Sequence, residues 1–239
     1  VPVALEVEEL NAGYGSFQVL FDVSFKLGEG EVLAVVGPNG SGKSTLLKAL
    51  FGLVTLYKGS IRLHGREITG LKPHQIARMG VVYLPQVDNV FTRLTVRENL
   101  LMASYRLPRE LAEERMEEAL EFFPQLKGML DRRAYTLSGG ERQMLALSMA
   151  MMIRPKLLML DEPSTGIAPK LADYIFRKVL ELRDTLGVSV ILVEQNARRA
   201  LESGDRAVLF VSGRVAFEGA CSELLNHPEL SSLYLGLTA

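Results

Sequence analysis

Short apolar runs alternate with amphipathic segments along most of this chain. Runs that are nearly free of polar residues are typical of strands buried on both faces of a parallel sheet. They span residues 32–36, 81–84, 157–160, 188–193 and 207–211. Ahead of them, residues 5–10 and 19–27 have the composition of strands, with turns expected at 11–15 and 28–30. The pattern predicts an α/β core preceded by a β-rich segment.

A helical insertion is expected between the second and third of these runs. Residues 96–105 and 110–123 are amphipathic and rich in Glu and Arg, with prolines near their ends. We assign residues 87–136 to this insertion. Residues 1–86 and 137–239 then form the core of a single domain that covers the whole chain.

A glycine-rich loop follows the first apolar run and precedes a helical pattern at 46–50. Strand, glycine loop and helix in this order are the context of a phosphate-binding loop. The glycines allow several backbone NH groups to point inward, Lys43 can reach the outer phosphates, and the Ser44 hydroxyl can ligate Mg²⁺. The residues predicted to bind nucleotide here are Gly37, Pro38, Asn39, Gly40, Ser41, Gly42, Lys43, Ser44 and Thr45.

A second phosphate-sized site is predicted at residues 137–143, Leu-Ser-Gly-Gly-Glu-Arg-Gln, directly before an apolar helix at 144–153. Small residues at a helix start let backbone NH groups approach an anion, which the helix dipole also attracts. Ser138, Gly139 and Gly140 are the residues predicted to bind there.

Two acids follow the apolar run at 157–160. An acid at the end of a core strand beside a phosphate loop is well placed to hold Mg²⁺, directly or through water, and we assign this to Asp161. Glu162 is then the candidate to polarise the attacking water. Glu162 and Lys43 are two of the predicted catalytic residues.

Composition narrows the range of partners. The chain has 239 residues, 48% of them apolar, and a formal net charge of −1, which gives no case for nonspecific binding of nucleic acid. The one cysteine, Cys221, excludes an internal disulfide and is typical of a reducing compartment. No apolar stretch approaches the ~20 residues that cross a bilayer. Because the first residues lack a signal-peptide pattern, a cytoplasmic protein is expected, with any membrane contact made through a partner.

These motifs resemble those of the nucleotide-binding subunit of an ATP-binding cassette transporter over essentially the whole chain. The resemblance implies an ATPase that uses ATP and Mg²⁺, on a P-loop NTPase core with an N-terminal antiparallel β subdomain and a helical insertion subdomain. It matches Tyr14 to the aromatic residue that stacks on adenine. It matches Gln86 to the glutamine that touches Mg²⁺ and water and senses the transmembrane partner, which makes Gln86 a third predicted catalytic residue.

Two positions depart from the family pattern. Gln195 stands where a histidine normally contacts the γ-phosphate, and although its amide can donate a hydrogen bond, it cannot become cationic. By its position Gln195 is the fourth predicted catalytic residue. His64, His74 and His227 lie in other segments and cannot replace it. Ala168 stands where an aspartate is common, so the usual polar contact of this loop across the dimer is not expected.

Residues 162–169 and 193–197 resemble the ATPases of importers of branched-chain amino acids and related amides or urea. In that subfamily two different ATPase subunits commonly pair beneath two permeases, which implies a second ATPase subunit, identical or different, on the inner face of the membrane. The family solution closes the Ser-Gly-Gly turn of one subunit over ATP bound at Lys43 of the other. The permease is expected near Gln86 and residues 87–94.

Other interpretations stay open at this point. At residues 87–94, Phe91 either offers the permease an apolar contact or packs with Val90 into the chain's own insertion. A non-transport cassette ATPase would share the catalytic motifs, whereas a GTPase is disfavoured because the chain has no Asn-Lys-x-Asp guanine motif. Gln195 motivates a rival of another class, a regulatory module that binds ATP without hydrolysing it.

Overall fold

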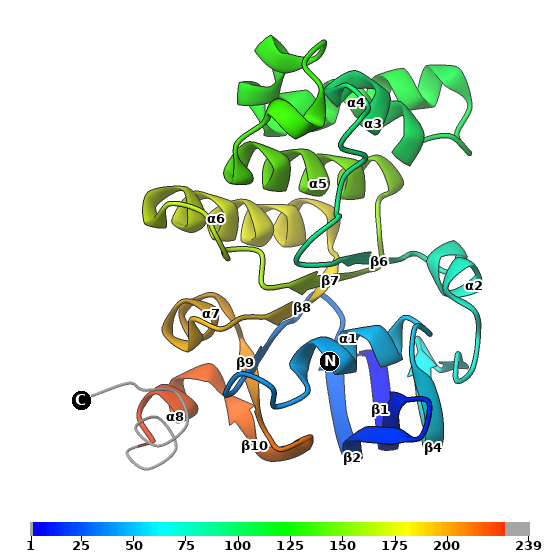
Figure 1. Ribbon diagram of the computed structural model, residues 1–239, viewed down its shortest axis with the longest axis vertical. Coiled ribbons are helices and arrows are strands. Elements are labelled where there is room, and N and C mark those ends of the chain that lie inside the picture. Colours follow the sequence, from blue (N-terminus) through cyan, green and yellow to red (C-terminus); the bar gives the residue numbers. More distant parts are fainter. Residues whose placement is uncertain (1, 228–239) are drawn as a thin grey trace.

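Two sheets organise the computed structural model, which describes residues 2–227 (Figure 1). A four-stranded antiparallel sheet has the order β2-β1-β4-β5, and a six-stranded sheet has the order β10-β9-β3-β8-β7-β6. In the larger sheet every neighbouring pair is parallel except β9 and β10. The strands are β1 (Val3–Tyr14), β2 (Phe17–Gly28), β3 (Val32–Val36), β4 (Thr55–Leu63), β5 (Arg66–Glu67), β6 (Val81–Leu84), β7 (Leu157–Asp161), β8 (Ser189–Val193), β9 (Arg206–Val211) and β10 (Arg214–Ala220).

Helices cover the larger sheet on the side away from the antiparallel sheet. In Figure 1, α3, α4 and α5 lie stacked at one end, and β1, β2 and β4 with α1 form the other. The α-helices are α1 (Lys43–Leu50), α2 (Pro73–Arg78), α3 (Val96–Ala103), α4 (Arg109–Phe122), α5 (Gly139–Ile153), α6 (Pro169–Leu186), α7 (Ala197–Ser203) and α8 (Cys221–Leu225). Short 3₁₀ helices occupy Pro124–Met129 and Ala134–Thr136.

Alternation along β7 shows how one strand serves two cores. Leu158 and Leu160 join an apolar cluster formed by α3, α4, α5 and α6. Leu157 and Met159 point the other way, into a cluster with α1 and the antiparallel sheet. Successive side chains of a strand lie on opposite faces, so in a strand buried on both faces every side chain is buried and apolar residues are favoured at every position. The unbroken apolar runs in the sequence have this origin.

The helices between residues 87 and 136 share their apolar cluster with the core. Val96 and Leu100 of α3 and Leu120 of α4 belong to the same cluster as the buried face of α5. This part of the chain is thus anchored on the sheet through α5. The division into a core and an insertion stays a prediction, and the outermost residues of the predicted domain, 1 and 228–239, lie outside the described part.

The predicted parallel strands are confirmed to within one residue at their ends. The predicted turn at 11–15 is wrong, because β1 continues to Tyr14 and the chain turns at Gly15. Asn11 does not end the strand, since its amide donates to Asp22 and accepts from Gln18 across the hairpin. The predicted helices at 96–105 and 110–123 are displaced by one or two residues at most, whereas α1 begins at Lys43, three residues before the predicted pattern, and α5 begins at Gly139, within the predicted anion site.

No helix within residues 2–227 is both long and apolar enough to span a membrane.

Candidate functional site

The predicted site residues gather at the carboxyl ends of β3, β7 and β8. Val193 of β8 is in register with Val35 of β3 on one side and with Asp161 of β7 on the other. The segments that follow these strands therefore leave the sheet side by side. In open α/β sheets this edge is where ligands bind.

The phosphate-binding loop has backbone requirements that glycine meets. Gly37 has φ 148°, and a Cβ there would lie 2.1 Å from the carbonyl oxygen of Phe210. Gly42, which precedes α1, has φ 104°. Among residues 2–227 the buried Ser41 hydroxyl has no hydrogen-bond partner, as suits a group completed by a phosphate oxygen. Together with Val19 and Glu162, the loop lines a pocket of about 160 Å³.

Lys43 is held within this loop. Its Nζ donates to the carbonyl oxygens of Gly37 at 2.8 Å and Pro38 at 2.9 Å. The side chain is buried, and this burial lowers the pKa of Lys43, although the carboxylates of Glu162 and Asp161 act in the opposite direction. The ammonium group is thus fixed at the floor of a pocket suited to anions.

Asp161 lies between two hydroxyl donors. Its Oδ1 accepts from Ser44 Oγ at 2.8 Å and its Oδ2 from the Tyr83 hydroxyl at 3.1 Å. Burial raises the pKa of Asp161, and the two hydrogen bonds partly oppose that shift. A buried carboxylate beside a serine hydroxyl is the oxygen donor set that suits Mg²⁺. Within residues 2–227 no cluster of three or more His, Cys, Asp or Glu forms a protein-only cage, so phosphates and water would supply the other ligands.

Glu162 has an unusual backbone and a tethered carboxylate. Its φ is 48°, a value that non-glycine residues rarely adopt, and its NH donates to the carbonyl of Val193 at 2.9 Å. Its Oε2 accepts from Gln86 Nε2 at 2.9 Å and from Thr165 Oγ1 at 3.0 Å. Gln86 therefore contacts Glu162, whereas the hydrogen bonds to Asp161 come from Ser44 and Tyr83.

The Ser-Gly-Gly turn lies at the start of α5. Ser138 is the exposed N-cap residue, with its Oγ accepting from the NH of Glu141 at 3.3 Å and its NH donating back to the Glu141 carboxylate at 2.7 Å. Gly140 is buried, and a Cβ there would lie 1.8 Å from Cδ2 of Leu171. The turn is thus fixed by a capping box and by packing against α6.

The two predicted phosphate sites do not line one common pocket in the described chain. Gly139 shares a pocket of about 340 Å³ with Gln86 and residues 87–90, and this pocket is separate from that of the phosphate-binding loop. Glu162 alone lines both. Glu162 therefore lies between the two pockets.

Three further predicted positions have the following surroundings. Tyr14 is 46% exposed, with its hydroxyl 3.4 Å from Thr45 Oγ1 at the edge of the phosphate-binding loop. Gln195 is exposed and lines a polar hollow of about 420 Å³ beside Ser164. Ala168 is the N-cap residue of α6 and supplies no side-chain hydrogen bond there.

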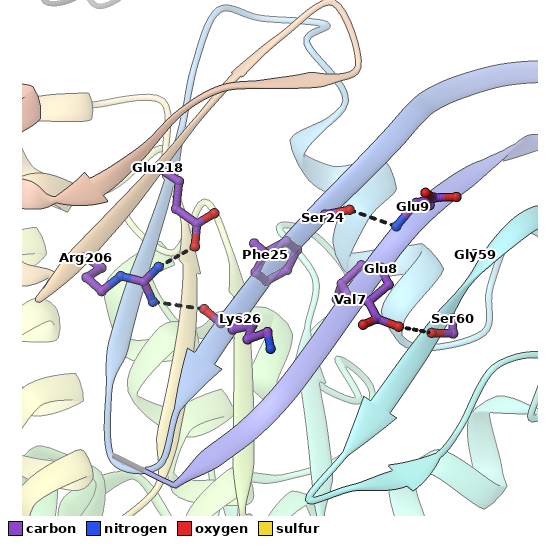
Figure 2. A pocket seen from close by; sticks show the side chains of 10 residues that line it. All are labelled: Val7, Glu8, Glu9, Ser24, Phe25, Lys26, Gly59, Ser60, Arg206 and Glu218. Atoms are coloured by element: carbon purple, nitrogen blue, oxygen red, sulfur yellow. Dashed lines mark hydrogen bonds and ion pairs between the residues drawn. The ribbon is translucent and has the colours of Figure 1, made fainter.

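A larger pocket of about 980 Å³ lies elsewhere, between the antiparallel sheet and β9–β10 (Figure 2). None of the predicted site residues lines it. Its polar groups are already engaged: Arg206 pairs with Glu218 and donates to the carbonyl of Lys26, and Ser60 donates to Glu8. Pocket size alone therefore does not locate the functional site in this molecule.

Sequence reasoning missed three groups in the site. Tyr83 holds Asp161, Thr165 holds Glu162, and the buried Glu194 accepts from the NH of Ser164 at 2.9 Å. A signal existed for Glu194, because it follows an apolar strand as Asp161 does. Tyr83 also carries a polar atom inside an apolar run, which indicates a specific partner.

A phosphate-binding loop, a buried aspartate on a nearby strand and a second carboxylate facing the loop define a P-loop nucleoside triphosphatase. Residues 20–165 match the family model described as ABC transporter. The chain belongs to this ATP-binding cassette family and is an ATP-hydrolysing, nucleotide-binding subunit of a membrane transporter.

Relatives resemble the chain over nearly its full length. It is 51% identical to the probable branched-chain amino acid transport ATP-binding protein LivF of Archaeoglobus fulgidus, covering 98% of this chain and 99% of the relative. It is 43% identical to the high-affinity branched-chain amino acid transport ATP-binding protein BraG of Pseudomonas aeruginosa, covering 97% and 99%.

Solved structures agree with the fold. A nucleotide-free ATP-binding cassette from an ABC transporter superposes with a TM-score of 0.86 at 28% identity, covering 99% of this chain and 100% of that one. The ADP conformation of another cassette gives 0.87 at 29% identity, covering 97% and 98%. The α/β architecture with its antiparallel sheet and helical part is therefore that of an ABC ATPase.

Proposed function

We propose that this chain energises the import of branched-chain amino acids or related amides. The supporting observation is the 51% and 43% identity to two ATP-binding proteins named for branched-chain amino acid transport. The lipopolysaccharide export protein LptB of Escherichia coli is less similar, at 34%. Because an ATPase subunit does not contact the cargo, this assignment rests on similarity and not on the site.

ATP is proposed to bind with its phosphates in the glycine loop and its adenine against Tyr14. Lys43 would then turn its ammonium from the loop carbonyls to the outer phosphates, and the loop NH groups would bind phosphate oxygens. Ser44 and Asp161 would hold Mg²⁺, with Gln86 as a third ligand. When bound, this ion would neutralise phosphate charge during transfer.

Glu162 is proposed to orient the attacking water. Its carboxylate lines the pocket of the phosphate-binding loop and is held by hydrogen bonds from Gln86 and Thr165. A carboxylate held in this way accepts a proton from water without having to search for its position. Gln195, exposed beside Ser164, would donate its amide NH to the γ-phosphate.

A second ATPase subunit is proposed to complete the site. Ser138, Gly139 and Gly140 of one subunit would close over ATP bound at Lys43 and Ser44 of the other. The separate pockets of the two motifs within one chain support this arrangement. ATP would then hold two subunits together, and hydrolysis would release them.

Permease subunits are proposed to contact Gln86 and residues 87–94, which would keep the protein on the cytoplasmic face of the membrane. Val87 is 67% and Phe91 is 49% exposed, whereas Val90 is buried. Val90 therefore packs into the chain's own core, whereas Phe91 is available for the proposed contact with a permease.

The first test is Glu162→Gln, with Glu202→Gln, an exposed carboxylate of α7, as the matched control. We expect Glu162→Gln to retain ATP binding and to lose turnover by a factor on the order of 10² to 10⁴. The control should turn over ATP like the wild type. Wild-type phosphate release by Glu162→Gln would refute the role of Glu162. Negligible ATP hydrolysis by the assembled wild-type complex would instead favour the regulatory module.

Uptake in membrane vesicles tests the cargo. The permease that copurifies with the chain is reconstituted with it, and ATP-dependent accumulation of labelled leucine, isoleucine, valine and short amides is measured. Accumulation of any of these supports the proposal. A complex that hydrolyses ATP but accumulates none of them would contradict the cargo assignment and leave the ATPase assignment intact, and failure to capture any permease would favour the non-transport ATPase.

A further inference from the structure

Glu194 is a buried carboxylate to which the proposed reaction gives no role. It directly follows β8 and is 1% exposed. A buried carboxylate is less favourable than an apolar side chain of similar size unless its oxygens are bound. The position of Glu194 among the catalytic segments therefore calls for a reason other than packing.

The contacts of Glu194 join the ends of three strands. Its backbone NH donates to the carbonyl of Val35 at 3.3 Å, on the strand that leads into the phosphate-binding loop. Its Oε1 accepts from the NH of Ser164 at 2.9 Å, in the turn that follows β7. The backbone of Asn196 also interacts with the carboxylate, lowering the pKa of Glu194 against the larger effect of burial, which raises it. One side chain thus ties the turn after β7 to the loop after β8.

The turn that it ties carries the strained residue Glu162. A non-glycine residue with φ near 48° persists only where its surroundings over-determine the conformation. The end of β8 supplies two such restraints. The carbonyl of Val193 accepts from the NH of Glu162, and the carboxylate of Glu194 accepts from the NH of Ser164. They hold the turn before and after Pro163, so the Glu162 carboxylate has a fixed direction.

Gln195 is positioned by the residues on either side of it. It lies between Glu194 and Asn196, and the Asn196 side chain caps α7 by accepting from the NH of Arg199 at 3.2 Å. Both neighbours of Gln195 are therefore anchored, while Gln195 itself is exposed.

We propose that Glu194 is a positioning residue that sets the relative placement of Glu162 and Gln195 above the phosphate-binding loop. The carboxylate acts through its hydrogen bond from the NH of Ser164 and through its place in the chain directly before Gln195, and it does not touch ATP. This inference rests on the proposed role of Glu162 as the water-orienting group.

The test compares Glu194→Leu, Glu194→Asp and Glu194→Gln in the full chain assembled with its transporter. Leucine keeps the side-chain volume and removes the oxygen that accepts from Ser164. Aspartate keeps the carboxylate but shortens the side chain by one methylene. Glutamine keeps an acceptor oxygen at the original side-chain length. We expect the leucine variant to lose kcat by about 10- to 100-fold with KM for ATP nearly unchanged, because displaced catalytic groups slow the chemical step. The aspartate variant should be intermediate, and glutamine should restore most of the turnover.

Glu202→Leu, on the exposed face of α7, is the matched control and should leave turnover unchanged. Circular dichroism and a melting curve identify variants that do not fold, and the aspartate variant carries the test if leucine fails. A second readout is the effect of Glu194→Leu in a Glu162→Gln background, where we expect a smaller fold-loss of kcat than in the wild type, because only the placement of Gln195 is left to disturb.

Several results would overturn the proposal. Wild-type kcat in both the leucine and aspartate variants would do so, as would a glutamine variant as slow as leucine. Equal losses of kcat from Glu194→Leu in both backgrounds would mean that Glu194 does not act through Glu162. If Glu162→Gln itself retains wild-type turnover, the role of Glu162 fails first, and that result is distinct from any outcome at Glu194.

Discussion

Gly140 gives the sharpest test of how the turn before α5 is built. It is the second residue of α5 and is buried against Leu171 of α6. A Cβ at Gly140 would lie 1.8 Å from Cδ2 and 2.7 Å from Cγ of Leu171. Gly140→Ala therefore requires the Leu171 side chain to leave its position.

The expected cost follows from two opposing terms. Inserting a methyl group into a packed site costs about 1–3 kcal/mol. Replacing glycine by alanine in a helix returns about 1 kcal/mol. We expect a net loss of about 1 kcal/mol in the free energy of unfolding, which lowers Tm by about 2–4 °C in a chain of this size.

Urea denaturation of four proteins isolates the contact: the wild type, Gly140→Ala, Leu171→Ala and the double variant. In the Leu171→Ala background the obstructing atoms are gone, so Gly140→Ala should cost nothing or stabilise the protein. Gly128→Ala is the matched control, because a Cβ at Gly128 meets nothing within 4 Å. An equal cost in both backgrounds, or a Gly140→Ala variant as stable as the wild type, would refute the packing argument.

Turnover of the same proteins separates packing from ligand contact. Alanine leaves the backbone NH of residue 140 in place, and only Ser138 and Gly139 of the turn are accessible from outside. We therefore expect Gly140→Ala to leave ATPase activity unchanged in the Leu171→Ala background.

Three other predictions follow from the site. Tyr83→Phe removes a hydrogen bond to the buried Asp161 carboxylate and should lower the free energy of unfolding at pH 7 by about 1.5–3 kcal/mol in urea titrations, against Tyr57→Phe, on an exposed tyrosine, as control. Ser138→Arg should abolish hydrolysis while leaving ATP affinity of the monomer nearly intact, because the arginine side chain would block the approach of the turn to ATP on the other subunit. Ser138→Ala loses the helix cap and the hydroxyl but blocks nothing, so it should retain more hydrolysis than Ser138→Arg. A parallel fall in ATP binding by Ser138→Arg would contradict the two-subunit site. Burial raises the pKa of Glu194 above its ordinary value of 4.5, so this carboxyl makes the wild type less stable as pH rises from 4.5 to the native pKa. Glutamine does not titrate, so the free energy of unfolding of Glu194→Gln minus that of the wild type should grow over this pH range and then level off. A difference that stays constant with pH would contradict the prediction.

The parallel strands and the phosphate-binding loop could be predicted because their signals are local. A strand buried on both faces has an unbroken apolar run. Each glycine of the loop is required by the backbone conformation at its own position. The hairpin at residues 11–15 could not be predicted in the same way. Its polar residues resemble a turn, but Asn11 is satisfied by Gln18 and Asp22 from the opposite strand.

The missed site residues act over distances along the chain that no local pattern spans. Tyr83 meets Asp161 across 78 positions, and Glu194 meets Ser164 across 30. Tyr83 stands opposite Met159 in the parallel pairing of β6 with β7, which brings its hydroxyl to the end of the neighbouring strand. Such pairs follow from the strand order 3-8-7-6 of the larger sheet, and the sequence alone does not give that order.

The partly exposed segment that begins at Gln86 contacts both Glu162 and helix α5. Gln86 donates to the Glu162 carboxylate, and three residues later Asn89 donates to Gln143 of α5 at 3.0 Å. A displacement of this segment by a partner at Phe91 would thus act on the Glu162 carboxylate, with its proposed role in catalysis, and on the helix that Ser138 caps. Because those two groups are proposed to serve ATP molecules bound by different subunits, one contact at the surface would change both sites at once.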